Sequence, residues 1–154
     1  MKRHYFVICS IAFLTAMIGR YITSAGMGWY KTLILPSWTP QGWIISSVWI
    51  FIFILTTISA IIVWDKRSGS TRFFFVIFLF CMNAVFNIMW SHIFFGKHFL
   101  DIATFEAAIL GLITLTLMVL LWPISRKAAF LLLPYVGWVV FATYLTYTVW
   151  QLNI

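Results

Sequence analysis

Five long apolar runs, separated by short polar breaks, take up nearly the whole chain, at 4–26, 43–64, 73–95, 102–122 and 128–150. A membrane-spanning helix needs about 20 mostly apolar residues, and each run is long enough. The second run, WIISSVWIFIFILTTISAIIVW, lacks the alternation of apolar and polar positions expected in a membrane β-barrel. We therefore expect an all-α integral membrane protein, a five-transmembrane-helix bundle that forms a single membrane domain over 1–154.

The break between the first two runs is unusually aromatic. The segment 29–49 reads WYKTLILPSWTPQGWIISSVW and holds four of the nine tryptophans: Trp29, Trp38, Trp43 and Trp49. A loop in water gains nothing from exposed indoles, whereas Trp is favoured at a membrane interface or over a ligand pocket. Pro36 and Pro40 disfavour a regular helix here. We expect residues 29–42 to form an ordered, aromatic loop between helices 1 and 2 that covers the bundle at the bilayer surface.

Composition and charge fit the same picture, because the chain is 64% hydrophobic and only 8% charged. The net charge of +7 comes from basic residues that five crossings divide unequally between the two sides of the membrane. One side has Lys2, Arg3, Lys66, Arg67, Arg72, Arg126 and Lys127, and the other has Arg20, Lys31 and Lys97. The positive-inside rule then places the N-terminus in the cytoplasm and the C-terminus outside. The basic balance reflects topology, and we expect no nucleic-acid partner.

The N-terminal run and the cysteines each have a second interpretation. Met-Lys-Arg before an apolar run also fits a cleaved signal peptide with its apolar region at 5–19, whose removal would leave four helices. Cys9 and Cys81 both fall inside spans, where we expect buried small side chains rather than a disulfide.

Polar residues inside the spans are few. Asn83 and Asn87 lie four apart on one helical face, and an amide facing lipid is costly, so both should face the bundle interior. For Asn83 we favour a hydrogen bond between helices, and for Asn87, near Trp90, contact with a ligand is an equal alternative. Glu106 is a carboxyl group inside a span, which is a functional candidate, although it could also reach the membrane surface or bond to a neighbouring helix.

Helix 4 and helix 5 carry packing signals. Ala103, Ala107 and Gly111 form a ridge of small residues suited to close helix packing or dimerisation. Pro134 should kink the last helix by freeing the carbonyl of Phe130. Trp138 and Ala142 fall on the Pro134 face, where the small Ala142 leaves room for a flat aromatic guest.

Five motifs together resemble the TspO family of tryptophan-rich sensory proteins and mitochondrial translocator proteins, also called peripheral benzodiazepine receptors. They follow one another in the family's order and spacing over about residues 28 to 153: WY at 29–30, PSWTP at 36–40, VW at 48–49, N-x-x-W with FFG at 87–96, and PY-x-x-W-x-x-x-A at 134–142. The resemblance implies a five-helix bundle, commonly a homodimer, with a pocket beneath the loop joining the first two helices.

The resemblance also implies ligands. That family binds porphyrins, notably protoporphyrin IX, and isoquinoline carboxamide-type drugs of the benzodiazepine site, and some bacterial members are reported to degrade protoporphyrin in light and oxygen. Carried over to matching positions, and with Trp90 added from the N-x-x-W motif, the expected ligand-binding residues are Tyr30, Pro40, Trp49, Phe53, Asn87, Trp90, Trp138 and Ala142. Trp49 and Trp138 would face the porphyrin, and they become the catalytic pair if degradation occurs.

Two positions depart from the family pattern. Gln41 stands where the family usually has a second proline after PSWTP, which could loosen the loop. The final run LTYTVWQLNI lacks the basic residue of the cholesterol-recognition pattern, so cholesterol is not an expected partner. This absence also favours a bacterial cell membrane as the location.

Conventional catalytic groups are sparse, which leaves open whether the protein is an enzyme. The three acids are Asp65, Asp101 and Glu106, and the three histidines lack the two-ligand spacing of a metal site, so we expect no metal and no required cofactor, with porphyrin as ligand or substrate. Three hypotheses remain: a porphyrin- or tetrapyrrole-binding receptor or sensor, a light- and oxygen-dependent porphyrin-degrading protein, and a transporter of tetrapyrroles or other apolar metabolites.

Overall fold

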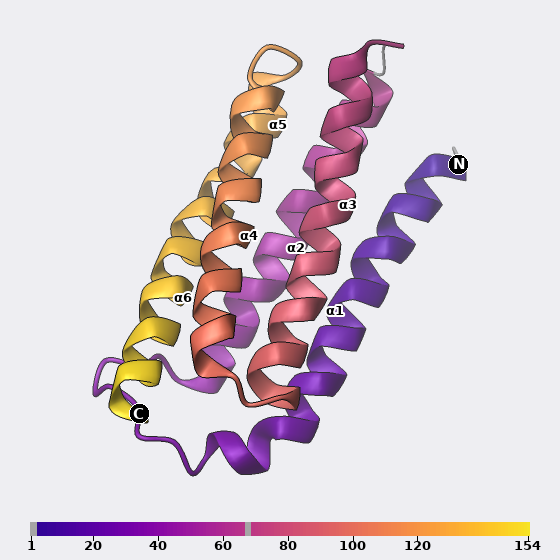
Figure 1. Cartoon of the computed structure of the whole chain (residues 1–154). Coiled ribbons are helices and arrows are strands. Elements are labelled where there is room, and N and C mark those ends of the chain that lie inside the picture. The colour runs from indigo at the N-terminus through magenta and orange to yellow at the C-terminus, as the bar shows by residue number, and fades with distance from the viewer. Residues whose placement is uncertain (1–2, 67–68) are drawn as a thin grey trace.

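The computed structural model describes residues 3–66 and 69–154, and it is a helical bundle (Figure 1). Its elements are α1 (Arg3–Tyr30), α2 (Gly42–Asp65), α3 (Thr71–Ser91), the π-helical turn η1 (His92–Gly96), α4 (Leu100–Leu121), α5 (Arg126–Leu131) and α6 (Leu133–Leu152). Within the described residues, five helical segments are long and apolar enough to cross a membrane, with η1 continuing α3 and α5 preceding α6 in the last one. The expected five-helix membrane bundle is confirmed.

The five spans are arranged as a closed ring. α1 packs against α2 and α3, α3 packs against α4, α4 packs against both α5 and α6, and α5 returns to α2. The ends of the chain lie at opposite ends of the bundle, as an odd number of crossings requires (Figure 1). The loop between α1 and α2 runs across the end of the bundle where the C-terminus lies, so it covers the interior there.

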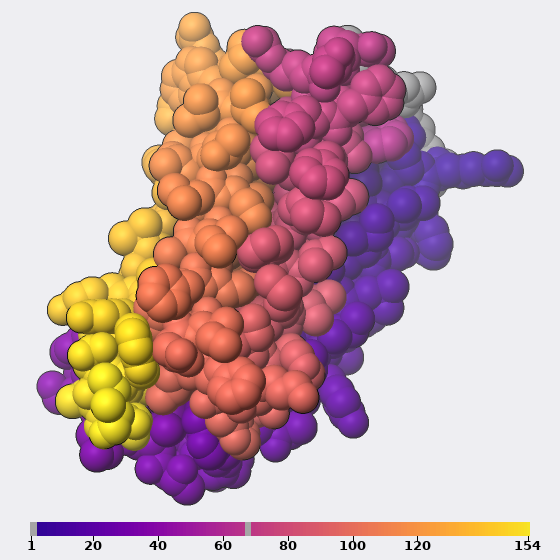
Figure 2. Space-filling view, in the orientation of Figure 1, coloured from indigo at the N-terminus to yellow at the C-terminus, as the bar shows by residue number. Residues whose placement is uncertain are grey.

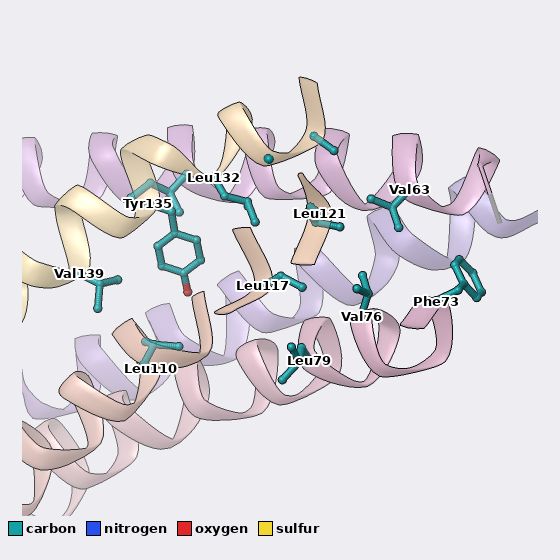
Figure 3. Close-up of a cluster of buried hydrophobic side chains, with 13 residues drawn as sticks. Val63, Phe73, Val76, Leu79, Leu110, Leu117, Leu121, Leu132, Tyr135 and Val139 are labelled. Atoms are coloured by element: carbon teal, nitrogen blue, oxygen red, sulfur yellow. The ribbon is translucent and has the colours of Figure 1, made fainter. Parts of the chain in front are cut away.

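The interior has two hydrophobic clusters, one towards each end of the bundle. The larger cluster takes residues from α2, α3, α4, α5 and α6, including Val63, Val76, Leu117 and Leu132 (Figure 3). The smaller cluster, at the end covered by the loop, contains Phe94, Phe95, Leu100, Ala103 and Val149.

The outer surface is apolar, as expected for a protein that faces lipid. Figure 2 shows the face of the bundle formed by α3 and α4. Exposed large side chains of these two helices include Phe74, Phe78, Phe105, Leu112 and Val119. Cys9 and Cys81 are also exposed and unpaired, so the expectation that they are buried is wrong. Both cysteines can lie on the lipid-facing surface because a small apolar thiol is as compatible with lipid as with the protein core.

Helix ends differ from the apolar runs at three places. α1 continues to Tyr30 because the first proline comes only at Pro36, so the loop itself covers 31–41 rather than 29–42. α3 continues as a π-helical turn to Gly96. The last span breaks at Leu132, and Pro134 sits in the first turn of α6, where its missing N–H costs nothing. The proline therefore separates two helices instead of kinking one.

The small-residue ridge on α4 serves packing inside the chain. Ala103 and Ala107 are fully or nearly fully buried. A Cβ on Gly111 would lie 3.3 Å from a methyl group of Val139 on α6. The ridge thus allows α4 and α6 to approach closely.

Basic residues described at the end where the N-terminus lies fit the predicted charge asymmetry. Lys66 Nζ donates to the carbonyl of Ile124 there, over 3.4 Å, and Arg126 lies over the ring of Trp122. Lys2 and Arg67, which belong to the same predicted group, lie outside the described residues. The assignment of that end to the cytoplasm stays a prediction.

Candidate functional site

A polar junction joins three helices in the middle of the bundle. Tyr135 on α6 is 2% exposed and points its hydroxyl into the interior, towards α4 (Figure 3). Asn87 donates to this hydroxyl, which in turn donates to Asn83 Oδ1 over 3.0 Å. Asn83 Nδ2 donates to Thr114 Oγ1 on α4 over 2.9 Å. The prediction of hydrogen bonding between helices by Asn83 is confirmed, and Asn87 belongs to the same network.

Two of the predicted ligand-binding aromatics stand beside this junction on α2. The ring of Trp49 meets that of Tyr135 edge-on at 6.0 Å, and Phe53 lies one turn away with its ring 6.0 Å from Trp49. Trp138 on α6 also packs against the cluster that contains Tyr135. The structure thus brings Trp49, Phe53, Trp138 and Asn87 around Tyr135.

Tyr30 and Trp90 form a second group, closer to the loop. Both pack around Phe94 and Phe95 of η1, with Trp90 stacked on Phe94 at 5.0 Å and Tyr30 5.6 Å from Phe95. The π-helical turn makes this possible, because its extra residue per turn lets both phenylalanines be buried. α1 comes so close here that a Cβ on Gly26 would lie 2.4 Å from the carbonyl oxygen of Phe95.

Aromatic stacking and hydrogen bonds fix the loop in place. Trp38 stacks on Tyr144 at 5.5 Å and meets Phe141 edge-on at 5.9 Å; Phe141 is in turn 5.1 Å from Trp138. The backbone N–H and C=O of Ile34 are both bonded to the side-chain amide of Asn153, each over 2.9 Å. The predicted ordered, aromatic loop is confirmed, and a chain of rings connects it to the site.

Gln41 lies at the start of α2. It occupies the N-cap position of α2 with extended backbone, and its side-chain oxygen accepts a 2.6 Å hydrogen bond from the indole N–H of Trp43. Pro40, just before it, is half-buried within the loop. The departure from the family pattern therefore leaves an ordered start to α2.

Two indole N–H groups in the site have no partner. The Nε1 atoms of Trp90 and Trp138 are buried, and neither donates a hydrogen bond to any residue that the structure describes. A buried donor without an acceptor costs about 1–3 kcal/mol, and such groups in native proteins usually have a reason. Each indole N–H is therefore a hydrogen-bond donor that no described residue uses.

An apolar cavity of about 350 Å³ lies between α1, α2 and α3 in the other half of the bundle. It extends from His4 and Trp64, near the N-terminus, to Asn83 and Tyr135 at the polar junction. Phe53 lines it, and it reaches the inner side of the site without being lined by Trp49, Trp90 or Trp138. The cavity and the site therefore meet at Tyr135.

A family model matches the chain from residue 6 to residue 151, and its description is TspO/MBR family. The chain belongs to the TspO/MBR family. The match covers every span, the loop and all of the residues around Tyr135. The resemblance first noted in the motifs is confirmed over nearly the whole chain.

Named relatives come from bacteria and from animals. The chain is 30% identical to the tryptophan-rich protein TspO of Bacillus cereus over 153 residues, 99% of each chain. It is 32% identical to the protein CrtK of Rhodobacter capsulatus, covering 97% of this chain and 90% of that one. It is also 30% identical to the human translocator protein, covering 87% and 80%. Together with the five apolar helices, these relatives indicate a multi-pass integral membrane protein of this family.

Tyr135 is the central site residue that sequence reasoning missed. In the sequence it looks like one more wall aromatic beside Pro134. Its signal was indirect: Asn83 and Asn87 needed an interior partner, and Tyr135 is the first of six hydroxyl-bearing residues in the last span. Gly26 was also missed, because a glycine near a helix end resembles a helix stop rather than a contact point.

Proposed function

We propose that this TspO/MBR family protein is a membrane receptor or sensor that binds a porphyrin, with protoporphyrin IX as the reference ligand, inside the helix bundle. The observation that carries the proposal is the pair of buried, unpartnered indole N–H groups of Trp90 and Trp138 beside an ordered aromatic wall. A flat ring system can stack on such walls, and its polar groups can accept from the indoles.

Isoquinoline carboxamide-type ligands fit the same proposal. They combine a flat aromatic part with a carbonyl oxygen, which matches the aromatic surfaces and free donors of the site. The loop anchored by Trp38 and Asn153 would hold either ligand in and keep water out. We place the protein in a bacterial cell membrane, with the loop on the outer side as the positive-inside rule predicts.

The test is a titration of protoporphyrin IX into purified protein in the dark, followed by tryptophan quenching. We expect saturable quenching that an isoquinoline carboxamide reverses by competition. Quenching that does not saturate, or that the competitor does not affect, would contradict binding at this site.

A second candidate function is the light- and oxygen-dependent degradation of protoporphyrin. The contact of the Trp49 and Tyr135 rings supports it, because both side chains are oxidisable and Tyr135 is hydrogen-bonded to Asn87. Dioxygen would be the oxidant and the porphyrin the group oxidised, with Trp49 and Trp138 as the residues beside it. The test is to illuminate the bound complex with and without oxygen. We expect the porphyrin absorption bands to disappear only when oxygen is present, and to persist in Trp49→Phe or Trp138→Phe. An unchanged spectrum would exclude degradation.

A further inference from the structure

Glu106 is a buried carboxyl group without a partner. It lies on α4 and is 4% exposed, and neither of its oxygens accepts a hydrogen bond from any residue in the described part of the chain. It does not reach the membrane surface, and it does not bond to a neighbouring helix. An acid in this position costs folding free energy, and ionisable residues inside membrane spans are usually kept for function.

The helix geometry places Glu106 level with the site. Thr114 marks the polar junction on α4, and Glu106 lies two turns, about 12 Å, closer to the loop. On α3, Trp90 lies a nearly equal distance from Asn83 in the direction of the loop. On α6, Ala142 lies the same distance from Tyr135 in that direction. Because α4 packs against both α3 and α6, these three residues lie at about one depth in the membrane.

The surroundings of Glu106 support this placement. One turn towards the loop, Ala103 belongs to the smaller hydrophobic cluster, and one turn the other way, Leu110 belongs to the larger one. Glu106 therefore lies where the two clusters meet.

Two unused hydrogen-bonding groups, on Trp90 and Glu106, thus occur in this layer of the bundle, and a third, on Trp138, lies about one helical turn closer to the polar junction. The indoles of Trp90 and Trp138 can only donate, whereas the carboxyl group of Glu106 has an oxygen that can accept whether the group is protonated or not. A bound molecule that satisfies all three must carry an oxygen acceptor and also an N–H or O–H donor. This requirement excludes more ligands than a requirement for a flat, apolar molecule would.

We propose that Glu106 is a ligand-binding residue that accepts a hydrogen bond from an N–H or O–H group of the bound aromatic molecule. The inference rests on the proposed function, since it takes the ligand to lie in this site. It assigns the selection of donor-bearing ligands to Glu106, and the binding of the ligand's oxygen atoms to the tryptophans.

The test compares two probes that differ in a single donor: an isoquinoline secondary carboxamide with an amide N–H, and its N-methylated form. Dissociation constants are measured by tryptophan quenching in the dark. Glu106→Leu is expected to weaken binding of the N–H probe about tenfold and to change that of the N-methylated probe less than about threefold. Glu106→Gln should retain most of the affinity, because its amide oxygen still accepts. Asp101→Asn, exposed in the first turn of the same helix, is the matched control and should change neither.

Protoporphyrin IX is titrated into the same variants to separate the two proposals. If protoporphyrin IX and both probes all fail to bind the unmodified protein saturably, the proposed function is wrong, and so is this inference. If protoporphyrin IX binds but Glu106→Leu leaves every dissociation constant unchanged, or weakens both probes equally, only the role of Glu106 is wrong.

Thermal unfolding of the same variants in detergent checks that a loss of affinity is not a loss of structure. Removing a buried acid that has no partner should leave the midpoint of Glu106→Leu unchanged or higher. A midpoint several degrees lower would show that the carboxyl group is needed for folding, and would overturn the assignment.

Discussion

The side-chain amide of Asn87 on α3 donates a hydrogen bond to the hydroxyl of Tyr135 on α6. The same hydroxyl donates to Asn83, so one phenol links two amides that are a turn apart. The membrane interior contains no water to hydrogen-bond these groups, so each must have its partner within the protein. The bond fixes α3 relative to α6 directly below the level of Trp90 and Trp138, and so fixes the walls of the site.

Tyr135→Phe should therefore destabilise the protein. The substitution keeps the ring but removes the hydroxyl, which leaves the Asn87 amide without this acceptor and Asn83 without this donor. We expect a loss of about 1–3 kcal/mol in the free energy of unfolding, measured in detergent by denaturant titration. Tyr21→Phe, on an exposed tyrosine of α1, is the control and should change it by less than about 0.5 kcal/mol. Equal stabilities for the two variants would show that the junction contributes nothing.

Gly26→Ala should disturb the contact between α1 and η1. Its Cβ would meet the backbone carbonyl oxygen of Phe95 at 2.4 Å, and backbone cannot move aside as a side-chain tip can. A loss of about 1–3 kcal/mol is expected, seen as a lower thermal midpoint. Gly28→Ala is the matched control, because nothing lies within 4 Å of its added Cβ. A normal midpoint for Gly26→Ala would mean that the two helices are not in contact there.

Asn153→Ala should release the middle of the loop without unfolding the bundle. The Asn153 amide holds both backbone groups of Ile34, whereas its contact with the helices is one hydrogen bond to the carbonyl of Val149 in the last turn of α6. Hydrogen exchange at the Ile34 amide should become at least about tenfold faster, with a change of less than about 1 kcal/mol in global stability. Gln151→Ala, on an exposed side chain two residues earlier, should leave the exchange rate as it was. Unchanged exchange in Asn153→Ala would argue that Trp38 alone holds the loop.

Most of the fold could be predicted from the sequence, because a lipid environment imposes simple rules. Apolar length fixes the five spans, and the tryptophans and prolines of 29–42 locate the loop. Helix ends were less accurate: α1 runs on through Trp29 and Tyr30, since those residues are as compatible with a helix as with a loop. The π-helical turn was not foreseen, because it depends on how Phe94 and Phe95 pack rather than on a local sequence signal.

The candidate site was only partly predictable. Spacing within one helix showed that Asn83 and Asn87 share a face, and family motifs supplied the aromatic residues. The sequence could not show how far α3, α4 and α6 slide along one another, and that register decides which residues meet. Tyr135 and the unpartnered state of Glu106 became visible only once the register was known.

The most direct test of the account compares protoporphyrin IX binding, in the dark, to Trp138→Phe and to Trp122→Phe. Trp138 has a buried and unpartnered indole N–H inside the bundle, whereas Trp122 is 47% exposed after α4, at the end away from the loop. Loss of one hydrogen bond to the ligand should raise the dissociation constant of Trp138→Phe about five- to tenfold, with no change for Trp122→Phe. Equal dissociation constants for both variants and the unmodified protein would contradict a porphyrin site at Trp138.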